Sequence, residues 1–240
     1  MTDELFLEDS YLKEFDARVV KLGGREVVLD RTAFYPGGGG QPPDKGALGI
    51  GPISASVVDV RRVKGEAGPG IVHVLDNPIP DSVRELRGAL DWERRSAHMR
   101  HHTALHVLSG VIWKNFGAKV TGGQMRADRA RMDFSFPGEW TTEVVGEIER
   151  LTNQALAEER PVKVYELPRE EAMQNPDLIR TQVNLVPQRV EMIRIVEIEG
   201  LDTQADGGTH VANTSEVGRM EITGHKSKGR QNKRIEFVLR

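Results

Sequence analysis

The segment DWERRSAHMRHHTALHVLSGVIWKNFG, residues 91–117, marks the point where the pattern of the sequence changes. Apolar residues recur in it at three- and four-residue spacing, which is typical of the buried face of a helix. These residues are Leu105, Leu108, Ile112 and Phe116. Asp91 is a plausible N-cap and Gly117 a plausible stop. The spacing therefore predicts a helix over 92–116.

The residues before this helix alternate between apolar and polar in short runs, as strands do. ARVVKL and REVVLD flank Gly23–Gly24, which is a hairpin signal. ISASVVDVRRV and GIVHVLD flank the glycine-containing loop KGEAGPG. Four short strands joined by glycine-rich turns predict a small β-barrel or an open sheet.

The residues after the helix mix both kinds of element. We expect a turn at Gly122–Gly123, a second helix at about 141–158 and a short helix at 168–173. Strands are predicted near 131–136, 162–167, 191–198, 219–224 and 234–240. The predicted fold class is α+β: a β-barrel-like domain at 1–90, followed by a mixed α/β domain at 91–240.

Composition limits the possible functions. The 240 residues carry 33 basic and 36 acidic side chains, a net charge of −3, so nucleic-acid contact requires a local basic patch. Cysteine is absent, which excludes disulfides and thiolate ligands. No apolar run approaches the roughly 18 residues of a spanning helix, and the acidic N-terminus does not resemble a secretory signal. We expect a cytoplasmic protein with no membrane partner.

Two histidines lie four residues apart within the predicted helix. His102 and His106 are therefore expected on one face, where two imidazoles can share a metal ion. Thr103 stands where the HExxH zinc motif has its glutamate, so a protease with a built-in general base is not indicated. Taken alone, this spacing is more often incidental. His98 and His101 are expected at the surface or behind the site.

A third histidine follows paired glycines in DGGTHVANTSEVG. Gly207, Gly208 and Thr209, which precede His210, are candidate substrate-binding residues, because glycines let a backbone turn tightly and approach a ligand closely. Asp206 offers a carboxylate, which zinc accepts. An ordinary turn with an exposed histidine is the simpler interpretation of this segment taken by itself.

A glycine-rich segment, LDRTAFYPGGGGQPPDKG, lies in the first part of the chain. Its four consecutive glycines predict a close approach of backbone to backbone or to a ligand, although a flexible surface loop is equally compatible. Gly38, Gly39 and Gly40 are candidate substrate-binding residues. Thr32 and Gln41 flank them with neutral hydrogen-bonding groups.

These three segments together resemble the editing domain of alanyl-tRNA synthetase and its free-standing relatives, the AlaX proteins. The signatures occur here, in the expected order, as TAFYPGGGGQ, HTALH and DGGTHVANT. The resemblance covers most of the chain and implies the medium-length AlaX class. It also implies one zinc ion per chain, held by His102, His106 and His210.

One residue departs from the family pattern. Asp206 stands where the family usually has a metal-binding cysteine. Either the aspartate takes the coordination place, or water or substrate completes the three-histidine set. Sulfur is the softer and better zinc donor, so we expect weaker binding than at a thiolate site.

The resemblance implies a zinc-dependent aminoacyl-tRNA deacylase. Its substrate would be the acceptor end of tRNA(Ala) wrongly charged with serine, with glycine as a second candidate. A site that hydrogen-bonds the seryl hydroxyl rejects alanine well, and Thr32 is the candidate for that bond, supported by Gln41. A tRNA-binding module without activity, or a metal-dependent hydrolase of small esters or amides, are the alternatives.

Contact with tRNA phosphates requires cations. The segment GHKSKGRQNKR holds five without any acid: Lys226, Lys228, Arg230, Lys233 and Arg234. The segment RADRAR is a second candidate with a smaller charge excess. A solvated hairpin loop is an equally simple interpretation of the first segment. Neither segment contains aromatic residues for base stacking.

Overall fold

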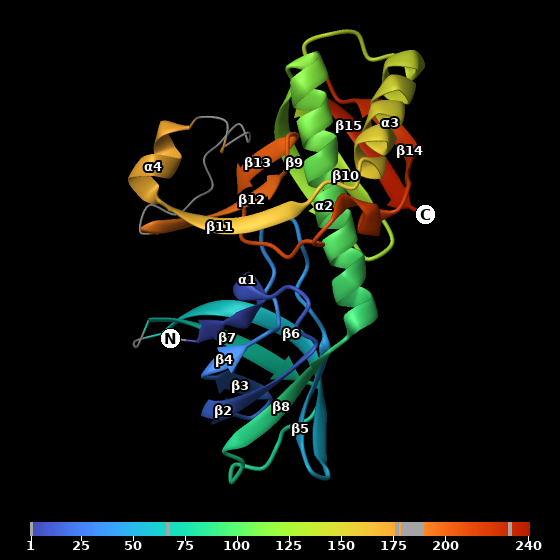
Figure 1. The fold of residues 1–240 in the computed structure, drawn as a ribbon. Helices are drawn as coiled ribbons and strands as arrows, with labels where there is room; N and C mark the ends of the chain where they lie inside the picture. The colour runs from blue at the N-terminus through green and yellow to red at the C-terminus, as the bar shows by residue number, and fades with distance from the viewer. Residues whose placement is uncertain (1, 66–67, 176–177, 179–189, 230–231) are drawn as a thin grey trace. The chain divides into compact units, whose positions relative to one another are not determined.

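The computed structural model describes residues 2–65, 68–175, 178, 190–229 and 232–240. The chain divides into two compact units, Met1–His98 and Met99–Arg240 (Figure 1). Within the described residues, no helix is long and apolar enough to span a bilayer.

The first unit is a closed six-stranded barrel with the strand order β2-β3-β7-β6-β5-β8 (Figure 1). In that order its strands are Glu14–Gly23, Glu26–Leu29, Gly68–Leu75, Ile53–Gly65, Gly46–Ile50 and Glu85–Leu90. A short helix α1, Leu5–Glu8, directly follows β1, Asp3–Glu4. Strand β1 pairs in parallel with β4, Arg31–Thr32. The predicted α+β class, with a barrel in the first part, is confirmed.

Buried and exposed residues alternate along the barrel strands, and the buried ones form an apolar core inside the barrel. Phe15 on β2 points inward and lies opposite Gly88 on β8. A Cβ at Gly88 would lie 2.3 Å from the Phe15 ring, so only glycine fits opposite this large side chain. The sequence prediction of four strands omitted β5 and β8, because glycine interrupts GALGI and ELRGAL and weakens their strand signal.

The helix α2 runs over Trp92–Phe116, as predicted. The carboxylate of Asp91 accepts the Arg94 N–H at 3.1 Å, and Gly117 ends the helix with φ +63°. Residues 101–112 are buried on every side of the helix. Of the two positions expected for His98 and His101, at the surface or behind the site, the first is wrong: both are buried, and the His101 ring stacks on Phe237.

The described residues of the second unit form two antiparallel sheets (Figure 1). One has the order β14-β15-β10-β9: Met220–Ser227, Asn232–Leu239, Ala130–Ser135 and Lys119–Met125. The other has the order β11-β12-β13: Val162–Pro168, Met192–Ile198 and Asp202–Ala205. The second unit also contains the helices α3 (Thr142–Ala157) and α4 (Arg169–Gln174) and the 3-10 helix Thr214–Val217.

The turn predicted at Gly122–Gly123 is wrong. Both glycines lie inside β9, opposite Asp133 and Met132 of β10, where the pairing register shifts. Glycine pairs mark bulges as well as turns, and this pair lies at such an irregularity.

Candidate metal centre

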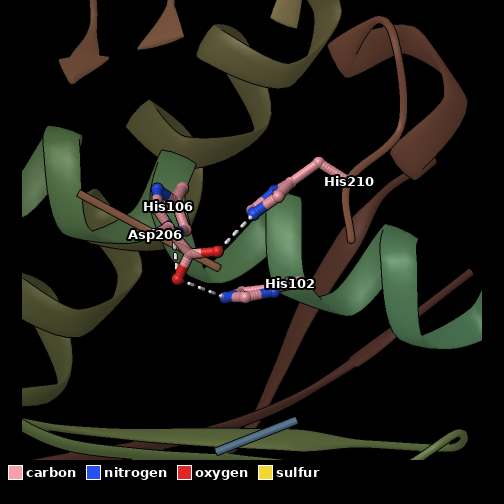
Figure 2. Close-up of side chains that lie close together, drawn as sticks. All are labelled: His102, His106, Asp206 and His210. Atoms are coloured by element: carbon pink, nitrogen blue, oxygen red, sulfur yellow. Dashed lines mark hydrogen bonds and ion pairs between the residues drawn. The ribbon is translucent and has the colours of Figure 1, made fainter. Parts of the chain in front are cut away.

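The helix α2 supplies two histidines from one face. His102 and His106 are both buried, and their ring centroids are 5.2 Å apart. Four residues of helix rotate the chain by slightly more than one turn, so the two rings point the same way. Figure 2 shows both rings directed toward the carboxylate of Asp206.

The loop after β13 brings in the other two groups. Within it, the Gly208 N–H donates to Asp206 Oδ1 at 2.6 Å, which closes a tight turn. Arg194 Nη1 donates to the carbonyl oxygens of Asp206 and Gly208, both at 3.0 Å. This turn carries His210 over α2, where its ring centroid is 4.2 Å from that of His102.

The four side chains converge on a volume the size of one ion. Nε2 of His210 lies 3.1 Å from Asp206 Oδ1, and Nε2 of His102 lies 3.5 Å from Oδ2. Nε2 of His106 lies 4.0 Å from the same oxygen. All four ligand atoms are within 4.8 Å of one another. Tetrahedral ligands at about 2.0–2.2 Å from zinc are themselves roughly 3.3–3.6 Å apart, so small adjustments would complete a shell.

The environment holds these groups in the protonation state that a metal requires. Burial lowers the pKa of His210 to about 4 and that of His102 well below its ordinary value. Burial alone would raise the pKa of Asp206, but the facing histidines lower it by more. The pKa of Asp206 is therefore well below its ordinary range. Neutral imidazoles and an ionised carboxylate are the ligand forms of these residues.

Two buried side chains behind the ligands did not stand out in the sequence for this role. Asp202 Oδ2 lies 2.9 Å from His106 Nδ1, and Thr103 Oγ1 lies 3.2 Å from His210 Nδ1. A carboxylate only accepts, so His106 carries its proton on Nδ1 and presents a bare Nε2 toward Asp206. A lone pair facing a carboxylate is repulsive without a cation between them. The donor set therefore fits a divalent cation such as zinc.

The glycine-rich segment forms a tight hairpin in the first unit. Gly38 and Gln41 exchange two backbone hydrogen bonds, of 3.0 and 2.8 Å. Gly39 and Gly40, at the tip, have φ +57° and +90°, as a type I′ turn requires. A Cβ at Gly37 would lie 3.3 Å from the backbone nitrogen of Pro43, a close approach of backbone to backbone of the kind that the glycine run predicted.

Thr32 lies inside the barrel beside a buried histidine. Its hydroxyl is 2.8 Å from His73 Nε2 and accepts the Phe34 N–H at 3.1 Å. Nδ1 of His73 lies 3.2 Å from the carbonyl oxygen of Val27, which can only accept, so Nδ1 carries the proton. The Thr32 hydroxyl consequently donates to Nε2 and, within the part of the chain that the structure describes, keeps one lone pair without a hydrogen bond. Gln41 is also buried.

The predicted cationic segment is partly engaged in structure. Lys226 is exposed, whereas Lys233 is buried and donates to Ser227 Oγ and the Gly229 carbonyl. Arg234 forms two hydrogen bonds to Asp133, and Lys228 lies 3.7 Å from the same carboxylate. Arg230 lies outside the described residues. Arg234 also lines a hollow of about 540 Å³ together with Arg126, Arg129 and Arg131 of the second candidate segment.

Comparison with known proteins assigns the class and then the family. Residues 193–236 match the threonyl and alanyl tRNA synthetase second additional domain, so this part of the second unit is similar to a domain of those synthetases. The chain is 41% identical over 243 residues to the alanyl-tRNA editing protein AlaX-M of Saccharolobus solfataricus, covering all of both chains. It is 39% identical to AlaX-M of Methanosarcina barkeri, covering 100% of this chain and 99% of that protein.

The chain therefore belongs to the AlaX-M family of alanyl-tRNA editing proteins. It is also 44% identical to the alanine–tRNA ligase of Pyrococcus abyssi, over 92% of this chain but only 24% of the ligase. The similarity thus covers one part of that synthetase.

Proposed function

We propose that this protein is a zinc-dependent deacylase that hydrolyses the aminoacyl ester of mischarged tRNA(Ala) in trans. The convergence of three buried imidazoles and one carboxylate carries this proposal. The AlaX-M relatives support the substrate class, because their names specify alanyl-tRNA editing. A tRNA substrate places the proposed reaction in the cytoplasm.

The proposed residues divide between the two parts of the chain. Residues 91–240 would hold zinc through His102, His106, His210 and Asp206. Zinc bound there would supply Lewis-acid polarisation or an activated water. Gly207, Gly208 and Thr209 shape the turn that positions His210, and residues 1–90 carry the selectivity element.

Selectivity for serine is proposed to reside in Thr32, with Gln41 supporting the same pocket. The Thr32 hydroxyl donates to His73, so toward a substrate it acts only as an acceptor. A seryl hydroxyl donates to such a group, and an alanyl methyl leaves it unpaired. Thr32 has no exposed surface, so the role requires that substrate binding uncovers it. Glycine, without a hydroxyl, would enter only by its small size.

The acceptor stem is proposed to contact the cationic segment through Lys226, Lys228 and Arg230. Lys228 is exposed and forms a long ion pair with Asp133, at 3.7 Å, whereas Lys233 and Arg234 donate short hydrogen bonds to protein groups. The glycine hairpin at Gly38, Gly39 and Gly40 supplies a bare backbone for close approach to the substrate. Gly39 supports this, because a Cβ placed on it would meet no atom within 4 Å.

The deciding experiment is single-turnover hydrolysis of Ser-tRNA(Ala), with the protein as purified, after chelation, and after zinc is added back. We expect hydrolysis that chelation abolishes and zinc restores. Binding of the tRNA without hydrolysis would favour an inactive tRNA-binding module. Hydrolysis of free seryl esters at the same rate would favour a hydrolase of small esters. Either result would overturn the proposal.

A further inference from the structure

The metal-facing side of α2 continues beyond its two histidines to a glycine. His102, His106 and Gly110 follow one another at intervals of four residues, so they lie along one face of the helix. A glycine inside a helix destabilises it relative to alanine, so its presence in a buried helix indicates a packing requirement.

That requirement is the close approach of the segment that starts β13. A Cβ at Gly110 would lie 3.0 Å from the Leu201 carbonyl oxygen and 3.1 Å from Asp202 Cβ. Both distances are tighter than ordinary van der Waals contact. The absence of a side chain at Gly110 therefore lets Asp202 come against the helix one turn after His106.

At this position the Asp202 carboxylate engages His106 from behind. Its Oδ2 lies 2.9 Å from His106 Nδ1 and also accepts Gln204 Nε2 at 2.8 Å. The second bond fixes the carboxylate, and the first fixes both the orientation of the His106 ring and the nitrogen that carries its proton. His106 can then offer only Nε2 to a metal.

We propose that Asp202 is a positioning residue for the metal centre and that Gly110 is the residue that admits it. The negative carboxylate makes His106 a more basic ligand, which strengthens a donor set that contains no thiolate. This inference rests on the metal-binding part of the proposed function. It requires neither deacylase activity nor a particular tRNA.

The first test measures zinc affinity of the full-length protein by competition with a chromophoric chelator, in the absence of tRNA. Asp202→Asn keeps the size of the side chain and removes its charge, and we expect affinity to fall about 10- to 100-fold. Asp133→Asn removes a carboxylate that bonds Arg234 and no histidine, and it should leave affinity unchanged. Unchanged affinity in Asp202→Asn, or a wild-type protein that binds no zinc, would overturn the inference.

The glycine provides a second, matched pair of variants. Gly110→Ala should weaken zinc binding several-fold, because the added methyl displaces Asp202 by a few tenths of an ångström. Gly146 of α3 is also a helical glycine, but a Cβ there would meet no atom within 4 Å. Gly146→Ala should therefore keep wild-type zinc affinity. Equal zinc affinity in the two alanine variants would contradict the role of Gly110.

A third readout needs no metal. Nitrogen-15 NMR of the metal-free protein reports which ring nitrogen of His106 carries the proton. We expect the Nδ1–H form in the wild type and a mixture of both forms in Asp202→Asn. Finding the Nε2–H form in the wild type would contradict the inference. Failure of Ser-tRNA(Ala) hydrolysis with these results intact would instead count against the proposed function alone.

Discussion

The two units of this protein both bury histidines, and they do so with opposite consequences. In the barrel, both ring nitrogens of His73 have oxygen partners, Thr32 on one side and Val27 on the other. In the second unit, His102, His106 and His210 direct nitrogens at one carboxylate. Burial lowers the pKa of His73 and of His210 to about 4 alike. A lowered pKa therefore does not identify the metal centre; convergence of donors does.

The largest effect should come from removing one converging donor. His210→Ala leaves a three-ligand remnant, and we expect the single-turnover rate on Ser-tRNA(Ala) to fall about 10³-fold, because metal assistance contributes several kcal/mol. Elemental analysis should show loss of zinc in parallel. His73→Gln, which alters a histidine with two satisfied nitrogens, should retain one zinc per chain. Zinc loss in His73→Gln would contradict the distinction between the barrel histidine and the histidines of the candidate metal centre.

The Thr32 hydroxyl is already hydrogen-bonded to His73, and mutating it tests whether such a group can also select a substrate. Thr32→Val preserves shape and removes the hydroxyl, and we expect the ratio of seryl to alanyl ester hydrolysis to fall about 10- to 100-fold, because one buried hydrogen bond is lost. Thr32→Ser retains the hydroxyl and should restore much of the ratio. The measurement compares single-turnover rates on the two charged tRNAs. An unchanged ratio in Thr32→Val would refute the selectivity role.

The pH dependence of stability should reveal His73 by itself. Its folded pKa of about 4 lies below the ordinary 6.5, so between these values the unfolded chain binds a proton that the folded chain does not. Stability is therefore lost as pH falls, by about 2 kcal/mol between pH 6.5 and pH 5. Denaturant unfolding of wild type and His73→Gln at both pH values isolates this contribution, since the other histidines cancel. Parallel losses in both proteins would contradict it.

Much of the fold followed from periodicity and caps. Helix α2 was predicted at its observed bounds because Asp91 and Gly117 mark both ends and the apolar spacing is regular. The sequence does not predict the strands β5 and β8, because these two neighbours in the barrel are far apart in the sequence and their short glycine-containing segments show no local pattern. The sequence leaves open whether His101 lies at the surface or behind the site, because a helix buried on all sides has no polar face to reveal its orientation.

The candidate centre was predictable only as far as motifs reach. His102, His106, Asp206 and His210 lie in the segments that carry the family resemblance, and the structure brings them together. Asp202 follows an ordinary strand pattern and gave no signal. Gly110, spaced as His102 and His106 are, was the available clue, because a helical glycine aligned with two ligand candidates indicates that something packs there.

The smallest effect concerns the surface, where the same distinction between engaged and available groups applies. Lys226 is exposed and has no partner among the described residues, whereas Lys233 is buried and holds the loop at Ser227 and Gly229. If Lys226 contacts phosphate, Lys226→Ala should weaken tRNA binding a few-fold and reduce the salt slope by about 0.7–0.9. Lys233→Met should instead lower the unfolding midpoint and leave the slope intact. Fluorescence titration of tRNA(Ala) at several salt concentrations provides the affinity and the salt slope, and denaturant unfolding provides the midpoint. A salt slope that changes only in Lys233→Met would reverse the assignment.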